Sequence, residues 1–295
     1  MNRVKNKKIG LILFLAPALV LFCTFFVIPV IYVAFTSLCQ WNGIEDMRFI
    51  GLENYKYIFS NPTFRLSIRN NVIWALVASF VQVPLALLMS LILARKPKGW
   101  RVFRTIYFFP QVISGIALAM LWQAAFNAEF GMVNGLLELV GLGKYTTNWL
   151  GNPNTALGSV IGYWVCYIGY YLIIIMSDIT NVDQTYYEAA ELDGASKIQQ
   201  DIYITLPLIK NSIITCISLA AVMGIRTFEQ VYAMTNGGPM NKTSVMGLFL
   251  YKEMQNGNYG RANASAMVLI AVGTFVVVTI RTLFNRKEKR GSKGV

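Results

Sequence analysis

The sequence predicts an all-α membrane protein with six transmembrane helices and a pair of short cytoplasmic helices between the fourth and the fifth. The first indication is composition: the 295-residue chain is 55% hydrophobic and only 14% charged, whereas about a quarter of the residues in a soluble domain are charged. The second is the length of its apolar runs, several of which reach the roughly 20 residues that a helix needs to cross a bilayer. The third is a polar segment at 183–207, whose capping residues are typical of two short helices.

Six apolar segments are long enough to cross the hydrocarbon core. They lie at 9–37, 70–94, 105–126, 155–178, 208–234 and 262–284. Three of them contain proline, and neighbouring helices can satisfy the backbone groups that such kinks release. The first run has no small-residue cleavage site, so we interpret it as a retained span and not as a signal peptide. A shorter amphipathic segment at 129–141 is expected to lie at the membrane surface.

The net charge of +12 would suggest nucleic-acid binding in a soluble protein. In a membrane protein, Lys and Arg instead collect in cytoplasmic loops and fix the orientation. Most of the 26 Lys and Arg residues fall at the two termini, in the loop at 95–104 and in the loop at 183–207. We therefore predict a multi-pass domain at 9–284 between basic cytoplasmic segments at 1–8 and 285–295, and no nucleic-acid partner.

The composition leaves little catalytic chemistry to this chain. The absence of histidine excludes histidine-based zinc sites, Ser-His-Asp triads and histidine proton relays. The four cysteines have no CxxC spacing and lie mostly in apolar runs, so we interpret them as small buried hydrophobes. Asp178 and Glu229 are the only acids within or bordering the later spans. We therefore expect no metal site, no bound cofactor and no enzymatic activity, with an intramembrane enzyme as the weaker alternative.

The polar segment contains two sets of capping residues. Thr185 and Glu188 fit the S/T-x-x-E capping box, with Thr185 as N-cap. Gly194 fits the left-handed position just past a helix end. Ser196 and Gln199 then begin a second short helix in the same way. The local prediction is a helix, a glycine turn, a second helix and then the fifth span.

This segment resembles the EAA loop of binding-protein-dependent ABC importer permeases, whose pattern is EAA, three residues, G, nine residues and I-x-LP. The residues that match the pattern are Glu188, Ala189, Ala190, Gly194, Ile204, Leu206 and Pro207. The TNGGP run at 235–239, the GLENY run at 51–55 and the N-terminal apolar segment resemble the first-permease type of the maltose/oligosaccharide branch. The resemblance covers nearly the whole chain and implies the cytoplasmic membrane of a bacterium or archaeon.

The resemblance implies that 183–207 forms coupling helices, which dock in a cleft of a separate ATPase. The residues that it assigns to ATPase coupling are Glu188, Ala189, Ala190, Asp193, Gly194, Ile204, Leu206 and Pro207. ATP and Mg would be bound by that ATPase, because this chain has no GxxxxGK[ST] phosphate-binding loop. The implied partners are a second, homologous permease, two ATPase subunits, an extracellular solute-binding protein and membrane lipid.

A candidate substrate pathway begins with a polar face on the fourth span. The residues of this face, which recur at helical spacing, are Tyr163, Cys166, Tyr167, Tyr170 and Tyr171. Tyrosine rings stack on sugar faces and their hydroxyls bond sugar hydroxyls, although outer tyrosines also act as interfacial anchors. In the fifth span, Arg226 and Glu229 are three residues apart, so they face a pathway or form an ion pair that fixes the helix.

Sugar-contact positions of maltose-type permeases can be carried over through the shared motifs. The resemblance places them at Tyr163, Cys166, Tyr167, Tyr170, Ala220, Met223, Gly224 and Glu229, to which we add Arg226 from its place in the span. The residue types depart from the maltose pattern, so maltose itself is not expected.

We predict a permease subunit that moves a carbohydrate, in particular a di- or oligosaccharide, into the cytoplasm by alternating access. A permease for a glycerol phosphate or a polyol stays open as an alternative. A secondary transporter that works without ATP is the other competitor. It would show inverted repeats and coupling carboxylates or broken helices at the midplane, and the sequence has no convincing repeat.

Overall fold

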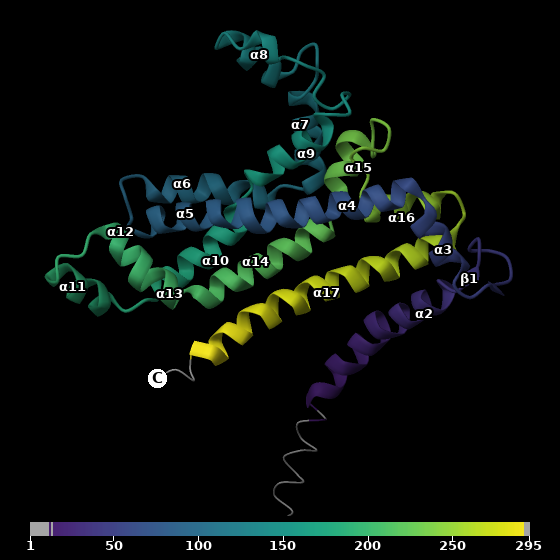
Figure 1. The fold of residues 1–295 in the computed structure, drawn as a ribbon, viewed down its shortest axis with the longest axis horizontal. Coiled ribbons are helices and arrows are strands. Elements are labelled where there is room, and N and C mark those ends of the chain that lie inside the picture. Colours follow the sequence, from purple (N-terminus) through teal and green to yellow (C-terminus); the bar gives the residue numbers. More distant parts are fainter. Residues whose placement is uncertain (1–11, 13, 292–295) are drawn as a thin grey trace, which may run out of the picture. The chain divides into compact units, whose positions relative to one another are not determined.

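The computed structural model describes residue 12 and residues 14–291, with side chains up to residue 282. The predicted segment 1–8 and the last part of the predicted tail, 292–295, lie outside the described residues. Within the described part, the regular structure is helical except for one two-stranded hairpin (Figure 1). The predicted all-α membrane class is therefore confirmed.

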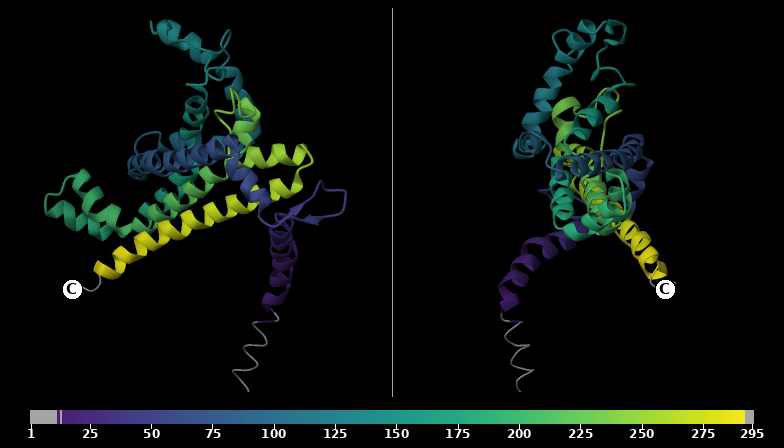
Figure 2. Two further views of the ribbon diagram at one scale, coloured as in Figure 1. Left: turned by 45° about the vertical axis from the view of Figure 1, so that its right-hand side comes forward. Right: turned by 90° about the vertical axis from the view of Figure 1, so that its left-hand side faces the viewer.

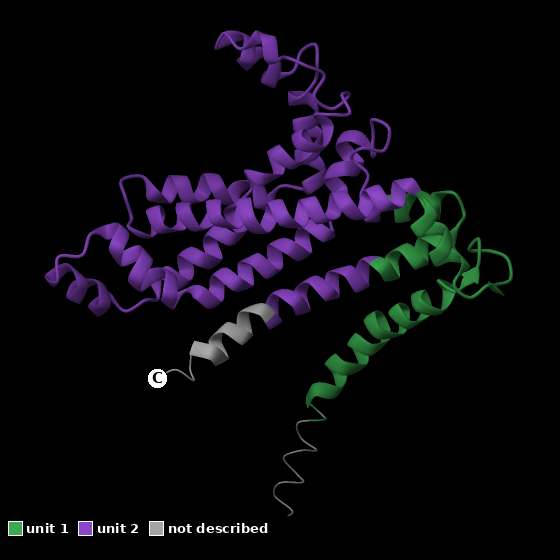
Figure 3. Cartoon of the chain, viewed as in Figure 1, with its two compact units in different colours: residues 1–61, 249–268 green, residues 62–248, 269–295 purple. Residues whose placement is uncertain are grey.

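After a helical segment at 14–22, the elements in chain order are η1 (Cys23–Val27), α2 (Ile28–Thr36), β1 (Cys39–Gln40), β2 (Arg48–Phe49), α3 (Glu53–Ser60), α4 (Pro62–Val77), η2 (Ala78–Gln82), α5 (Val83–Ala94), α6 (Trp100–Phe108), η3 (Phe109–Val112), α7 (Gly115–Ala125), α8 (Met132–Leu139), η4 (Gly143–Tyr145), α9 (Ala156–Val165), α10 (Gly169–Thr180), α11 (Gln184–Leu192), α12 (Lys197–Gln200), η5 (Asp201–Thr205), α13 (Leu206–Leu208), α14 (Lys210–Ile225), α15 (Glu229–Thr235), α16 (Met246–Gln255) and α17 (Tyr259–Gly291). The strands pair antiparallel, with Cys39 opposite Phe49. Two compact units are formed, one from residues 1–61 and 249–268 and the other from 62–248 and 269–295 (Figure 3).

Four described helices are long and apolar enough to cross a membrane. They are Phe14–Thr36, Pro62–Ala94, Ala156–Thr180 and Tyr259–Thr282. Two more candidates are bent pairs: Trp100–Val112 with Gly115–Ala125 turns by 103°, and Lys197–Leu208 with Lys210–Ile225 turns by 72°. By length and composition, the described chain thus has four candidate spans, or up to six if each bent pair is one span.

The predicted third and fifth spans are broken where continuous helices were expected. In the third, Pro110 lies in the short 3-10 turn η3, and Ile113 and Ser114 are extended before α7 begins. Proline cannot supply a helical N–H, so a break beside it is expected physically. In the predicted span 208–234, α14 ends at Ile225, and a separate helix, α15, begins at Glu229 after three intervening residues.

The second span begins earlier than the predicted 70–94, because α4 starts at Pro62. Polar residues lower the hydropathy of its first turns, but Ser67, Asn70 and Asn71 are fully buried and bonded inside the protein. A widened π-type turn, η2, directly precedes Pro84 in the first turn of α5. Such a turn accommodates the missing N–H without ending the helix.

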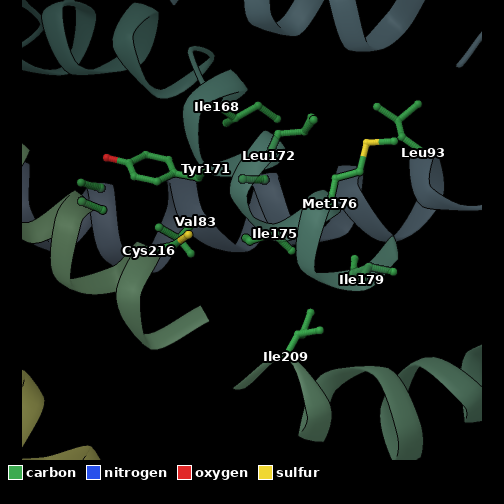
Figure 4. Close-up of a cluster of buried hydrophobic side chains, with 13 residues drawn as sticks. Val83, Leu93, Ile168, Tyr171, Leu172, Ile175, Met176, Ile179, Ile209 and Cys216 are labelled. Carbon is green, nitrogen blue, oxygen red and sulfur yellow. The ribbon is translucent and has the colours of Figure 1, made fainter. Parts of the chain in front are cut away.

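The core of the second unit lies among α5, α10 and α14, which run beside one another (Figures 1 and 2). Its buried cluster combines branched residues such as Leu172 and Ile175 with small ones such as Ala86 and Ala220 (Figure 4). Lipid is as apolar as these side chains, so burial alone contributes little here, and close packing and hydrogen bonds must hold the helices. Ser90 supplies one such bond, since its hydroxyl donates to the Leu172 carbonyl at 3.0 Å.

Asn71 of α4 joins three segments of this unit. Its Nδ2 donates to the Ile225 carbonyl at 2.8 Å and the Gly224 carbonyl at 3.3 Å, at the end of α14. Its Oδ1 accepts the Met246 backbone N–H at 2.8 Å. The last carbonyls of a helix have no partner within the helix, so this buried amide satisfies the groups that the break after α14 releases.

Gly224 allows α14 to approach α4 closely. A Cβ at this position would lie 2.6 Å from both the Cα and the N of Ala75. Only glycine permits two backbones to come this near.

In the first unit, Asn54 of α3 occupies a similar position. It is buried, and its Nδ2 donates to the Ser37 carbonyl at 2.9 Å and the Cys39 carbonyl at 2.8 Å, just past the end of α2. Gly260 packs against the same turn, where a Cβ would lie 2.1 Å from the Cys39 oxygen. The asparagine of the GLENY run therefore closes the end of the first span.

Replacing Asn71 with alanine is expected to lower the free energy of unfolding by about 3 kcal/mol, because buried backbone groups lose their partners. Denaturant unfolding of the purified chain in detergent micelles measures the change. Asn211→Ala, at an exposed position of α14, is the matched control and is expected within about 0.5 kcal/mol of the parent. Equal stability of the two variants would show that Asn71 does not hold this junction.

Gly224→Ala is expected to destabilise the fold by about 1–3 kcal/mol, because the added methyl group forces α4 and α14 apart. Gly162→Ala in α9 is the control, since a Cβ there meets nothing within 4 Å; it should be neutral or stabilising by about 0.5–1 kcal/mol. The same unfolding assay compares the two. A Gly224→Ala chain as stable as the parent would contradict the close approach.

Candidate functional site

A cavity of about 530 Å³ lies in the second unit where three interrupted helices meet. The interruptions fall between η3 and α7, between α9 and α10, and between α14 and α15. We call it the tyrosine cavity. Its lining includes Gln82, Gln111, Gly115, Tyr163, Tyr167, Tyr170, Tyr171, Met223, Arg226 and Glu229. Broken helices at membrane depth are tolerated where they line a cavity or are buried in protein.

The tyrosine face predicted on the fourth span reaches this cavity, although the helix is interrupted at 166–168. The rings of Tyr163 and Tyr167 meet edge to face at 5.7 Å, and the Tyr167 hydroxyl accepts a hydrogen bond from the Trp122 indole N–H. Tyr170 is the most open of the set, with 42% of its surface exposed. Cys166 does not line the cavity; its thiol lies 3.8 Å from the Gly162 carbonyl.

Gln82, which the sequence analysis did not single out, holds the break between α9 and α10. Its Nε2 donates to the Trp164 carbonyl at 3.0 Å and to the Tyr167 carbonyl at 3.1 Å. Gln111 adds a second bond to the Tyr167 carbonyl, at 3.1 Å. Gln82 is 1% exposed, and its Oε1 has no hydrogen-bond partner among the described residues. Gln82 therefore acts on the cavity by holding the backbone of its wall, and its Oε1 is itself enclosed by protein. A glutamine two residues before a mid-span proline was the available sequence signal.

Arg226 and Glu229 both line the tyrosine cavity and are exposed there. Arg226 ends α14 and Glu229 begins α15; within the described part of the chain no ion pair joins them. Glu229 Oε2 lies beside Gly115, where a Cβ would come within 2.8 Å of it. Gly115 is the first residue of α7, and the partial positive charge of a helix start favours a carboxylate.

Of the remaining predicted pathway residues, one lines the tyrosine cavity and two pack against neighbouring helices. Met223 lines the cavity. Ala220 is fully buried in the core cluster, and Gly224 packs against α4, so neither is among the lining residues. The prediction carried these positions over from maltose-type permeases, but in this structure α14 turns Ala220 and Gly224 toward neighbouring helices.

The predicted coupling segment folds as α11, a turn at Gly194 and α12. Gly194 is left-handed, with φ of 78°, as its place past the helix predicts. The capping box of Ser196 and Gln199 is also present. The first cap differs from the prediction: Asp183 is the N-cap of α11 and accepts the Thr185 N–H. Aspartate is as good an N-cap as threonine or better, so the helix starts earlier and leaves Glu188 outside the cap.

The surface of this segment is unusually apolar for a polar loop. Leu192 is 91% exposed, and Ile198 and Tyr203 are also well exposed. Of the residues assigned to coupling, Glu188, Ala189, Asp193, Gly194 and Pro207 are exposed, and Ala190, Ile204 and Leu206 are half-buried. Exposed apolar groups clustered with polar ones mark an interaction surface.

The coupling segment is attached to α5 by charged groups. The Arg95 guanidinium pairs with Asp201 and donates to the Lys197 carbonyl at 3.0 Å. Lys197 pairs with Glu191, and the ammonium lowers the pKa of that carboxyl. The Thr185 backbone N–H likewise lowers the pKa of Asp183. A depressed carboxyl pKa contributes stability above the unfolded pKa and loses it as the pH falls through the folded value. Both contacts therefore persist at neutral pH.

Comparison with known proteins places the chain in a family. The family described as "Binding-protein-dependent transport system inner membrane component" matches residues 82–290. The probable ABC transporter permease protein YurN of Bacillus subtilis is 37% identical over 275 residues, which cover 91% of this chain and 94% of that protein. The diacetylchitobiose uptake system permease protein NgcF of Streptomyces coelicolor is 31% identical over 287 residues, covering 92% of this chain and 81% of that protein.

Among solved structures, a chain of a bacterial ABC transporter involved in the import of the acidic polysaccharide alginate has the same fold. Its TM-score is 0.83 at 21% identity, and the match covers 97% of this chain and 99% of that chain. The family match and these relatives span most of the sequence. The protein therefore belongs to the inner membrane components of binding-protein-dependent transport systems, the permease subunits of ABC importers.

Proposed function

We propose that this permease subunit passes a carbohydrate, in particular a di- or oligosaccharide, across the membrane by alternating access at the tyrosine cavity. As a family member it is a transport subunit and not itself catalytic. The observation that carries the proposal is the meeting of three broken helices around tyrosine rings and unpaired polar groups. Transporter sites near the midplane are typically built from such discontinuous helices.

The chemistry of the cavity favours a sugar over a phosphorylated solute. Tyrosine rings present flat apolar faces with a polar tip, and the exposed Tyr170 lines the cavity, where its hydroxyl suits a hydrogen bond to a sugar hydroxyl. Arg226 could attract a glycerol phosphate, but Glu229 lies on the same wall and would repel a dianion. A neutral polyhydroxylated ligand meets both groups as hydrogen-bond partners. The naming of the relative NgcF as a diacetylchitobiose uptake permease supports this class.

The segment at 183–207 is proposed to couple transport to ATP hydrolysis on a separate subunit. Its exposed Glu188 and apolar side chains such as Leu192 form a surface suited to a cleft in a partner. We infer that two ATPase subunits, a second homologous permease and an extracellular solute-binding protein complete the transporter. The distribution of Lys and Arg supports cytoplasmic termini and a cytoplasmic coupling segment.

An ATP-independent secondary transporter is the competing function, and the broken helices are the observation that favours it. Family membership favours the ABC importer. Uptake by the purified chain alone in proteoliposomes, without ATPase subunits, would support the competitor and contradict our proposal.

Glu188→Lys is expected to reduce ATPase association and transport by at least about ten-fold, because a reversed charge faces the ATPase. Co-purification of the ATPase subunits and ATP-driven uptake measure the two effects. Glu129→Lys makes the same charge change at an exposed residue outside the coupling segment, and it should leave both unchanged. If Glu188→Lys behaves like this control, the assignment of 183–207 is wrong.

Tyr170→Ala is expected to raise the KM for sugar uptake by about ten-fold, which corresponds to the loss of one stacking contact of roughly 1.4 kcal/mol. Uptake of a panel of disaccharides by the reconstituted transporter measures the change. Tyr145→Ala, which removes an exposed tyrosine outside the cavity, is the control. An unchanged KM across the panel, with normal ATPase association, would contradict a sugar path through the tyrosine cavity while leaving the coupling assignment intact.

A further inference from the structure

A second cavity of about 530 Å³ lies between α6 and α10, away from the tyrosine cavity. We call it the α6–α10 cleft. Its lining residues come from the start of the loop at 95–99, from one face of α6 and from the last turns of α10. They are Lys96, Trp100, Arg104, Thr105, Phe108, Ile173, Met176, Ser177 and Thr180. None of the residues assigned to the sugar path or to ATPase coupling lines it.

The charged groups of the cleft have one sign. Lys96 and Arg104 line it, and no Asp or Glu does. Neither cation has an ion-pair partner in the part of the chain that the structure describes. The nearest acid along α10 is Asp178, which accepts a hydrogen bond from Ser212 on α14. Lys96 also borders a neighbouring cavity that contains Glu191 and Asp201, but these carboxylates pair with Lys197 and Arg95. The cleft is therefore electropositive and complementary to an anion.

On both helices, the residues that line the cleft change from polar near the loop to apolar farther into the span. On α6, Trp100 and Arg104 are followed one turn later by Phe108. On α10, which runs the opposite way, Thr180 and Ser177 give way to Ile173. Eight residues of helix rise about 12 Å. The cleft thus begins polar and cationic at the loop and becomes wholly apolar about 12 Å into the span.

Trp100 marks the level of the membrane interface. Tryptophan is enriched where the hydrocarbon meets the headgroups, and the guanidinium of Arg104 lies 5.2 Å from the Trp100 ring centre. Thr105 and Phe108 are exposed on the adjoining face of α6, so the cleft is open along its length. A ligand can enter sideways from the bilayer.

We propose that the α6–α10 cleft binds one anionic phospholipid from the leaflet at which α6 begins. The headgroup phosphate pairs with Lys96 and Arg104, Thr105 and Ser177 lie at the level of the glycerol, and an acyl chain packs on Phe108, Ile173 and Met176. Basic pockets between membrane helices recognise anionic headgroups in this way. A soluble phosphate would leave the apolar half of the cleft unused, which is why we commit to a lipid.

The test is lipid retention by the full chain, measured by native mass spectrometry from detergent with dioleoyl phosphatidylglycerol or dioleoyl phosphatidylcholine added. We expect selective retention of one phosphatidylglycerol. Lys96→Gln and Arg104→Gln should each weaken it about five-fold. Lys98→Gln removes the same charge from the same loop but does not line the cleft, and it should leave retention unchanged. Equal losses in all three variants would indicate diffuse charge attraction and overturn the site.

Two further measurements test whether a soluble phosphate or the second permease occupies the cleft instead. Millimolar glycerol 1-phosphate should not displace the lipid; displacement would show a site for soluble phosphate. In the assembled transporter in nanodiscs, phosphatidylglycerol with a photoreactive acyl chain should label peptides of α6 and α10. Absence of that label in the assembled transporter would show that the second permease covers the cleft, and the proposal would fail.

Discussion

The structure depends on one constraint: backbone groups that a helix break releases inside the membrane must find partners within the protein. Each unsatisfied group costs several kcal/mol in hydrocarbon. Buried amides meet this demand at two breaks. Asn71 accepts and donates where α14 ends, and Gln82 donates to the carbonyls exposed between α9 and α10. Both amides are 1% exposed or less, so water cannot replace them.

The same constraint explains where the polar cavity lies. In a continuous helix, the backbone amides and carbonyls bond to one another. The packed helix faces of this protein are filled by apolar residues such as Leu172 and Ala220. Helix ends occur only at the interruptions, and three interruptions converge on the tyrosine cavity. Glu229 beside the start of α7 is stabilised by a helix end that an unbroken span would lack. The breaks therefore do more than bend the spans, because they create the polar site.

Local features could be predicted from the sequence, and long-range ones could not. Gly194 and the Ser196–Gln199 box were predictable because their partners lie within four residues. Thr185 was assigned as the first cap because the motif fits, but Asp183 lies two residues earlier and accepts the N–H of Thr185 itself. The partners of Asn71 lie more than 150 residues away in the sequence, so its role cannot be predicted from the residues around it. Hydropathy averaged over a window of about 19 residues does not show the break after Ile225, because the short, mostly polar run at 226–230 is averaged with the apolar residues before and after it.

The helix α5 connects the tyrosine cavity to the segment at 183–207. α5 begins directly after Gln82, which holds the wall of the tyrosine cavity, and it ends directly before Arg95, which holds α12 and η5. Its 12 residues span about 18 Å. Packing against α10 along this length keeps it from bending independently. In the proposed coupling role, a rigid displacement of 183–207 through Arg95 would reach Gln82, and with it the carbonyl of Tyr167, through a single stiff element. At one end the Arg95 guanidinium donates to the Lys197 carbonyl, and at the other the Gln82 amide donates to the Tyr167 carbonyl, so at each end a side chain next to α5 is bonded to the backbone of a neighbouring segment.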